Sequence, residues 1–246
     1  MSEAELVQME LQRQTELFGE SLVAARQAEV KEFTMSNDYL TVDFTTRGGM
    51  MSKVTLEEYT KYAPKGERNE KVVLYEPESA MFDMEFYVKK DLKNVPVNTA
   101  EYVFTSNGVE RGDGFQRLVM SLEVSGGAYL HYEYVLYDEK SPARDYMLDF
   151  NVKLENLSPI MASQSTLGME WVTKTYQNER GFKNENTYTT LSYRFPDEND
   201  VEDLGMSEEN KSKDVQSEVN WIAFKQQFFS EVFIAHNNFT YADMGF

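Results

Sequence analysis

The chain has 246 residues, 41% of them hydrophobic and 13% aromatic, which is enough to bury a sizeable core and excludes an intrinsically disordered protein. Its 24 basic and 42 acidic residues give a formal net charge of −18, so we expect no nucleic-acid partner, because a phosphate backbone would repel the chain. It has no cysteine, which excludes disulfides, thiolate zinc sites and cysteine nucleophiles. No apolar run approaches the roughly 18–20 residues of a membrane span, and no signal-peptide core precedes residue 30.

Residues 1–28 favour helix, because they are rich in Glu, Gln, Leu and Ala, lack proline and contain only one glycine, Gly19. Their apolar residues recur irregularly, which favours a solvated linker helix over the alternative, a helix docked on a sheet edge. We therefore expect a helical or disordered N-terminal tether over 1–28 and a single large domain over 29–246.

From about residue 30 the apolar residues recur with a period of two, which is typical of half-buried strands. Leu40, Val42 and Phe44 alternate with polar residues, and Gly48-Gly49 then permits a turn with positive φ, so we predict a hairpin. Further strands are predicted over 72–75, 84–88, 101–105, 115–124, 129–137, 146–154, 167–175, 188–195 and 231–236. Because almost no helical pattern separates them, a parallel sheet is excluded, and we predict a mostly β protein built as a large antiparallel β-sandwich.

The segment 197–218 interrupts this pattern with a concentration of acidic side chains, among them Asp200, Glu208 and Glu209. Their spacing does not match the calcium-binding loop of an EF-hand, so a solvated acidic loop is favoured over a calcium site. We predict no metal site.

The most aromatic stretch of the chain follows this acidic segment. At about 100° per residue, Trp221, Phe224, Phe228 and Phe229 fall on one apolar arc that also contains Lys225, and Ser217 followed by Glu218 suits a helix N-terminus. The spacing predicts one amphipathic helix near 218–230, partly docked on the sheet. Its candidate interaction or packing residues are Trp221, Phe224, Lys225, Phe228 and Phe229.

The side chains available for catalysis are few. The only histidines, His131 and His236, lie in separate predicted strands, and no serine has the spacing of a nucleophile elbow. The carboxylates Glu133 and Asp149, or Glu170 beside Trp171, do not indicate a glycosidase, since that assignment depends on a separation in space. A second set of aromatic residues offers a groove for sugar or peptide, although strand packing is the favoured interpretation: Trp171, Tyr129, Tyr132, Tyr134 and Tyr188. We predict no catalytic or cofactor-binding residues and therefore no enzyme.

Three stretches carry a resemblance to a known family. The run VNWIAFKQQFF (219–229) resembles the tryptophan-led helix in the large periplasmic (P1) domain of the YidC-family membrane-protein insertases, and Asn237-Asn238-Phe239 resembles the turn that comes after it there. The stretch 37–49, with NDYL at its start and TRGG at its end, resembles the family's first hairpin. ENTYTTLSY (185–193) resembles a strand upstream of the helix.

The resemblance implies a β-supersandwich of galactose-mutarotase-like architecture, held at the periplasmic face of the bacterial inner membrane as part of a multi-pass protein. It also implies a non-catalytic, cofactor-free role in the insertion and folding of inner-membrane proteins. The implied partners are the Sec translocon accessory proteins SecDF and nascent membrane proteins, with the membrane reached only through helices outside this sequence. The alternative is a carbohydrate-binding or mutarotase-like sandwich, which would be expected to gather histidines and a glutamate in one pocket.

The sequence departs from the family in its extent. The family's domain continues past the Asn-Asn-Phe turn with further strands and a closing amphipathic segment, whereas this chain ends at Phe246. We therefore expect the C-terminal part of the domain to be missing. Such a fragment is expected to fold, to be less stable than a longer version, and to self-associate through an open strand edge when salt screens its acidic surface.

Overall fold

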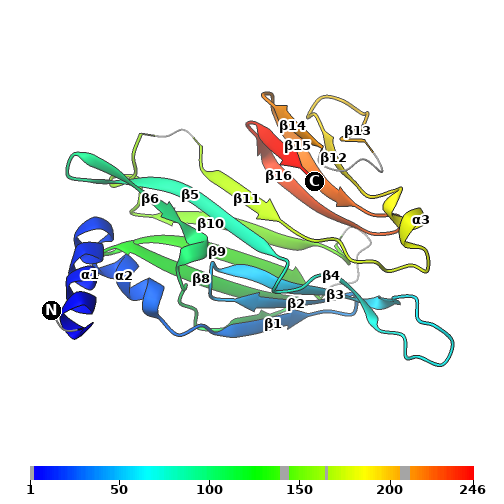
Figure 1. Ribbon diagram of the computed structural model, residues 1–246, viewed down its shortest axis with the longest axis horizontal. Coiled ribbons are helices and arrows are strands. Elements are labelled where there is room, and N and C mark those ends of the chain that lie inside the picture. Colours follow the sequence, from blue (N-terminus) through cyan, green and yellow to red (C-terminus); the bar gives the residue numbers. More distant parts are fainter. Residues whose placement is uncertain (1–2, 139–143, 164–165, 206–210) are drawn as a thin grey trace. The chain divides into compact units, whose positions relative to one another are not determined.

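The computed structural model describes residues 3–138, 144–163, 166–205 and 211–246. The chain divides into two compact units, one made of 1–59 and 75–174 and the other of 60–74 and 175–246. Antiparallel strands form most of each unit (Figure 1), which confirms the predicted mostly β, antiparallel fold class. None of the helices in the described residues is long and apolar enough to cross a membrane.

Ten strands lie wholly or almost wholly in the first unit. They are β1 (Glu32–Ser36), β2 (Leu40–Thr45), β3 (Met50–Thr60), β5 (Met81–Lys90), β6 (Lys93–Asn98), β7 (Val109–Gly112), β8 (Phe115–Ser125), β9 (Ala128–Tyr137), β10 (Leu148–Glu155) and β11 (Gly168–Val172). Their orders within sheets are β1-β2-β3, β10-β9-β8-β7 and β11-β5-β6. The predicted strands over 84–88, 115–124, 129–137 and 146–154 are thereby confirmed in position, and the one predicted over 167–175 is shortened to Gly168–Val172.

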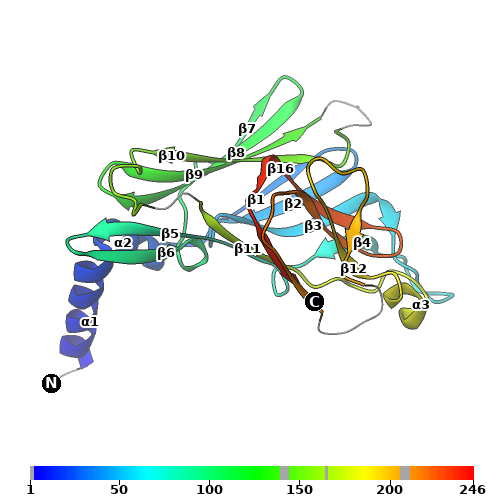
Figure 2. The same ribbon diagram turned by 90° about the horizontal axis from the view of Figure 1, so that it is seen from above.

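The sheet of β8, β9 and β10 supplies one layer of the first unit's core. Along β9 every second residue is buried, including Tyr132 and Tyr134, because successive side chains point to opposite faces of a strand. Phe44 of β2 lies 4.8 Å from Tyr134 between ring centroids, and Phe82 of β5 lies 5.5 Å from Phe150 of β10. The sheets that contain β2 and β5 therefore cover the same face, and the first unit is a sandwich (Figure 2).

The N-terminal residues form two helices, α1 (Glu3–Phe18) and α2 (Glu20–Gln27), separated by Gly19 at φ 88°. α2 buries Leu22 and Val23 and packs against β8, so it is docked on a sheet, which is the alternative that the sequence disfavoured. α1 is largely exposed and contacts the end of β5, where the Lys90 ammonium donates to the Thr15 carbonyl at 3.1 Å. The helical character of the segment is confirmed, and its function as a tether stays a prediction.

The predicted strand at 101–105 is wrong. A short 3-10 helix, η1 (Thr99–Glu101), occupies its beginning, and only isolated bridges at Val103 and Thr105 follow. The three residues after η1, numbered 102–104, are all buried, so the apolar run is enclosed on both sides instead of alternating across a sheet. The Thr99 hydroxyl accepts from the Met84 amide at 2.8 Å, which holds η1 against β5.

The described residues of the second unit form one short helix and seven strands or strand portions. They are β4 (Lys71–Tyr75), α3 (Phe182–Asn186), β12 (Thr190–Arg194), β13 (Glu202–Asp203), β14 (Ser212–Val215), β15 (Val219–Lys225), β16 (Ser230–Phe239) and β17 (Ala242–Gly245). One sheet has the order β13-β12-β15-β16, and β14 pairs with β17. Its core is a hydrophobic cluster of Leu191, Tyr193, Leu204, Val215, Val219, Ala242 and Met244.

The structure confirms the strands predicted at 72–75 and 231–236 and shortens the one at 188–195, because α3 and a turn occupy the residues before Thr190. The acidic segment 197–218 contains β13 and β14, so it is not wholly a solvated loop. Glu208 and Glu209 of that segment lie outside the described residues.

The predicted helix at 218–230 is wrong, because Val219–Lys225 forms the strand β15. β15 pairs with β12 on one side and with β16 on the other, so its backbone groups bond to neighbouring strands instead of to its own next turn. The residues after it turn the chain, with the Gln226 amide donating to the Phe229 carbonyl at 2.8 Å. Aromatic residues are favoured in strands, and two partner strands decide the outcome here.

The hairpin predicted around Gly48-Gly49 is confirmed by the pairing of β2 with β3. Both glycines have positive φ, at 72° and 63°. A Cβ atom on Gly49 would lie 2.9 Å from Tyr132 and 3.0 Å from Phe104, and Tyr134 donates its hydroxyl to the Gly49 carbonyl at 2.8 Å. The turn therefore packs directly against the aromatic core, with no room for a side chain at Gly49.

We expect Gly49→Ala to lower the free energy of unfolding by about 2–4 kcal/mol, because it adds a steric clash in the core to the strain of positive φ. Gly127→Ala is the matched control, since Gly127 has φ 79° but nothing within 4 Å of its Cβ position, and should cost only about 1 kcal/mol. Urea unfolding of both variants tests this expectation. Equal losses would show that the close approach to Tyr132 and Phe104 is not costly.

Candidate functional site

The hairpin of β15 and β16 has one face in the core and one face outside it. Ile222 and Phe224 pack against the buried cluster of the second unit. Trp221 alternates with them and is paired with Ile234, so both lie on the opposite face. Val232 lies on this face as well, through its pairing with Ala223.

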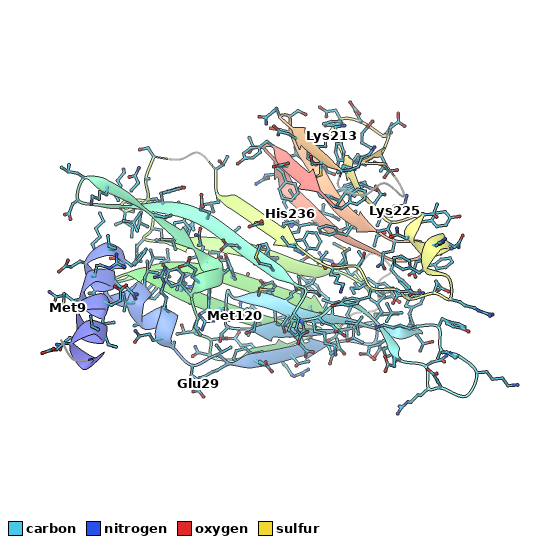
Figure 3. All side chains as sticks on the ribbon, in the orientation of Figure 1. Met9, Glu29, Met120, Lys213, Lys225 and His236 are labelled. Carbon is cyan, nitrogen blue, oxygen red and sulfur yellow. The ribbon has the colours of Figure 1, made fainter. Side chains whose placement is uncertain are left out.

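This outer face is apolar, and it is open to solvent along β16, whereas Ala223 on β15 is buried. Ile234 is 53% exposed and Val232 is 48% exposed, while Trp221 is half-buried. We call Trp221, Val232 and Ile234 the hairpin face. β16 is the last strand of its sheet in the described part of the chain, so the hairpin face borders a sheet edge. Figure 3 labels Lys225 and His236 on the two strands.

The five predicted interaction residues do not share one surface. Phe224 points to the core, Trp221 and Lys225 alternate to the outer face, and Phe228 is 65% exposed in the turn, with half-buried Phe229 beside it. Trp221 and Phe224 therefore lie on opposite faces, because the strand period of two separates residues that a helix would bring together. The candidate interaction residues predicted from the sequence did not include Val232 and Ile234, although their alternation in the predicted strand 231–236 was a usable signal.

An irregularity in β16 sets which residues reach the hairpin face. Val219 pairs with Phe239, but Trp221 pairs with Ile234, so four residues of β16 (235–238) lie opposite Asn220 alone. Asn238 adopts φ 59°, and its side chain bonds to Asn220 at 3.2 Å. This bulge allows Val219 to join the core while Trp221, two residues later, faces outward. The Asn-Asn-Phe motif is thus part of a bulged strand rather than a turn after a helix.

Glu231 is a carboxylic acid on the core side of the hairpin. It lies opposite Phe224, and its Oε2 atom is buried without a hydrogen-bond partner among the described residues. Burial raises the pKa of Glu231 to about 8, because the charged form loses hydration without gaining a compensating contact. At neutral pH this side chain is mostly protonated and uncharged.

His131 lies on the outer face of the β8–β10 sheet. Its Nδ1 atom is 2.8 Å from the Ser121 hydroxyl, and its Nε2 atom is 3.0 Å from a Glu155 oxygen. Ser121 is directly across from His131 in the strand register, so these contacts are those of neighbouring strands. His236 belongs to the other unit and is exposed on β16. The two histidines therefore belong to different units.

The other predicted polar pairs have ordinary partners. Glu133 lies 3.0 Å from Lys153 and 3.7 Å from Arg117, and Asp149 lies 2.8 Å from Arg144. Each carboxylate is thus neutralised by its own cation, which does not favour a catalytic carboxylate pair. Among the residues that the structure describes, no group of three or more His, Asp or Glu side chains is arranged to hold a metal ion.

The predicted aromatic groove is divided among different environments. Tyr132 and Tyr134 are buried in the first unit's core, Tyr129 stacks on His131 on the outer face, and Tyr188 is 42% exposed in the second unit. Trp171 lies on β11. Strand packing explains the buried pair, as the sequence favoured.

Comparison with known proteins gives one consistent result. The chain matches the YidC periplasmic domain family over residues 32–244. It is similar to proteins named membrane protein insertase YidC. It is 29% identical over 214 residues to the one from Azobacteroides pseudotrichonymphae, covering 86% of this chain and 32% of that relative. For Parabacteroides distasonis the identity is 28% over 230 residues, with 93% and 33% covered, and for Bacteroides fragilis it is 28% over 207 residues, with 84% and 30% covered. The chain thus spans about a third of the length of these curated relatives.

Glu231→Gln should change how stability depends on pH. The folded protein binds the Glu231 proton more tightly than the unfolded chain does, so its contribution to stability is complete below about pH 4.5 and is lost as the pH rises to about 8. Glutamine has no carboxyl group to ionise, so no buried charge forms in the variant as the pH rises. At pH 8–9 we therefore expect it to be more stable than the wild type by about 1–3 kcal/mol.

Urea unfolding from pH 4.5 to 9 measures this difference. Glu198→Gln, a change at an exposed carboxylate in the same unit, is the control and should follow the wild-type profile. If Glu231→Gln loses stability in parallel with the wild type, Glu231 is ionised and solvated in the folded protein.

Proposed function

The chain belongs to the YidC periplasmic domain family, and on this premise we propose that it serves as the non-catalytic extracytoplasmic domain of a membrane-protein insertase. The observation that carries the proposal is a family match over residues 32–244, with relatives that are named as insertases. The family lies on the periplasmic side of the bacterial inner membrane. The antiparallel β architecture agrees with the fold expected of such a domain.

The proposed role is interaction with other proteins during the insertion and folding of inner-membrane proteins. An exposed apolar face next to a sheet edge is a common site of protein contact, and the hairpin face has both features. We propose nascent membrane proteins and the Sec accessory proteins SecDF as its partners. The hairpin face replaces the predicted helix in this role.

We also propose that residues 29–246 form the interacting domain and that 1–28 connect it to the rest of its protein. The family match begins at residue 32, directly after the two helices, which supports this division. The docking of α2 through Leu22 and Val23 would fix the end of such a connection to the first unit.

The proposal that the chain does not catalyse a reaction has separate support. YidC insertases are not a classical enzyme family, and the comparisons give no support to the carbohydrate-binding alternative. In the structure both ring nitrogens of His131 are engaged, one by Ser121 and the other by Glu155. A mutarotase would need such a group to be directed at a sugar.

We expect a photo-crosslinking residue at Val232 or Ile234, in the protein that carries this chain and in its native envelope, to capture SecDF or nascent inner-membrane proteins. Leu92 is the control position, because it is a fully exposed apolar residue in the turn between β5 and β6. Capture at Leu92 as strong as at Ile234 would contradict the role of the hairpin face. Failure to capture any insertion partner at all three positions would contradict the proposed function.

The second expectation concerns activity. Purified protein should not accelerate the interconversion of hexose anomers or hydrolyse glycosides above the buffer rate, and His131→Ala and His236→Ala should behave identically. Polarimetry and a chromogenic glycoside assay measure this. Turnover that is lost in either histidine variant would overturn the non-catalytic assignment.

A further inference from the structure

Three tyrosines from distant parts of the sequence meet at the surface of the first unit. Tyr39 lies between β1 and β2, Tyr59 is near the end of β3, and Tyr146 comes just before β10. The ring centroid of Tyr146 is 5.2 Å from that of Tyr39 and 6.3 Å from that of Tyr59, with the planes inclined at 57° and 48°. Tyr59 is 44% exposed and Tyr146 is 43% exposed, so solvent reaches the rings.

A carboxylate completes this arrangement. Tyr146 donates its hydroxyl to Glu58 Oε2 at 2.7 Å, and Glu58 is itself exposed. Desolvation of the phenol, together with this contact, raises the pKa of Tyr146, so the hydroxyl stays protonated and remains a donor. We call Tyr39, Tyr59, Tyr146 and Glu58 the tyrosine cluster. It combines ring faces with negative potential and a full negative charge, which are the groups that recognise an organic cation.

A cation bound by a tyrosine ring and a carboxylate already occurs close to the cluster in the sequence. The Arg144 guanidinium lies 4.3 Å from the ring centroid of Tyr137 and bonds to Asp149 at 2.8 Å. Arg144 is two residues before Tyr146 in the sequence. The site that Tyr137 and Asp149 form for Arg144 therefore lies next in the chain to the tyrosine cluster, which has the same kinds of groups. At Tyr137 the cation comes from the chain itself.

We propose that the tyrosine cluster binds an arginine or lysine side chain from a basic peptide segment of a partner protein. A cation over the exposed face of Tyr146 would be within reach of a second ring, because cation–π attraction acts within about 6 Å of a ring centroid. Glu58 would supply the opposite charge, as Asp149 does for Arg144.

Charge favours a basic peptide as the occupant. The net charge of −18 raises the local concentration of cationic segments around the protein and excludes acidic ones. This long-range attraction is not specific to one position, whereas the rings and Glu58 are. The tyrosine cluster lies in the first unit and the hairpin face in the second, so this inference does not depend on the proposed function.

The test uses acetyl-Gly-Arg-Gly-Arg-Gly-Arg-amide as the probe and the neutral peptide with citrulline in place of arginine as its reference. Titration of the full chain at low ionic strength, followed by NMR of labelled tyrosine rings, should shift Tyr59 and Tyr146 with the arginine peptide only. We expect Tyr59→Leu with Tyr146→Leu to raise the Kd at least about fivefold, through the loss of two ring faces.

Two further variants make the result specific. Glu58→Gln keeps the rings and an acceptor for Tyr146 but removes the charge, so it should raise the Kd at least about threefold even if the double variant does not fold. Tyr87→Leu is the matched control, because Tyr87 is an exposed tyrosine whose hydroxyl also donates to a glutamate, Glu85, at 3.0 Å. It should leave the Kd within about twofold of the wild type.

Three results would overturn the proposal. The first is an equal increase of the Kd in Tyr87→Leu, which would mean that any surface tyrosine beside a carboxylate binds the peptide. The second is equal binding of the citrulline peptide. The third is displacement of the arginine peptide by phosphatidylethanolamine vesicles but not by free lysine peptide, which would identify an amine lipid headgroup as the ligand.

Discussion

The aromatic packing against one face of β9 is the interaction on which the first unit depends. Tyr132 and Tyr134 contact rings from β2, from β10 and from the segment after η1, and Tyr134 also holds the Gly49 turn through its hydroxyl. One strand therefore joins its own sheet to the sheet of β2, to the segment after η1 and to a tight turn. The opposite face of the same strand carries His131 and Glu133, whose partners are polar neighbours rather than core residues. Alternation along β9 thus assigns packing to one side and solvent contacts to the other.

This alternation is also what the sequence predicted best. In β8 and β9 a strict period of two continues for ten or more residues, which no helix satisfies, and the predicted boundaries agree with the observed ones to within a residue or two. The stretch at 218–230 is different, because its aromatic residues fit a helix or a strand. The choice depends on pairing with β12 and β16, which is information that the local sequence does not contain.

The strand β6 was not predicted, because its place in the sheet cannot be read from the local sequence either. Its Pro96 is unfavourable inside a sheet, but β6 is an edge strand of the described sheet, where the lost donor is tolerated.

The candidate surfaces could be predicted only in part. Trp221 was predicted as an interaction or packing residue, but its neighbours on the hairpin face come from the returning strand, at positions fixed by a bulge that no pattern revealed. The tyrosine cluster was not found at all. Its members lie at positions 39, 59 and 146, and each is an unremarkable strand-flanking aromatic until the sandwich brings them together. The histidines and carboxylates were left without a catalytic assignment, which stays a prediction, and polar contacts account for the positions of His131, Glu133 and Asp149.

The bulge in β16 has a meaning for how such a domain changes over evolutionary time. A regular hairpin couples its two ends rigidly, so a residue gained or lost at one end turns every side chain beyond it to the other face. Here the unpaired residues at 235–238 separate the Val219–Phe239 pair, which belongs to the core, from the Trp221–Ile234 pair, which does not. The residues of the hairpin face can therefore change in composition while the Val219–Phe239 pair keeps its place in the core, whereas Ile222 and Phe224 still tie the register of β15 to the core. Selection for a new partner and selection for a stable fold act on different residues of the same two strands.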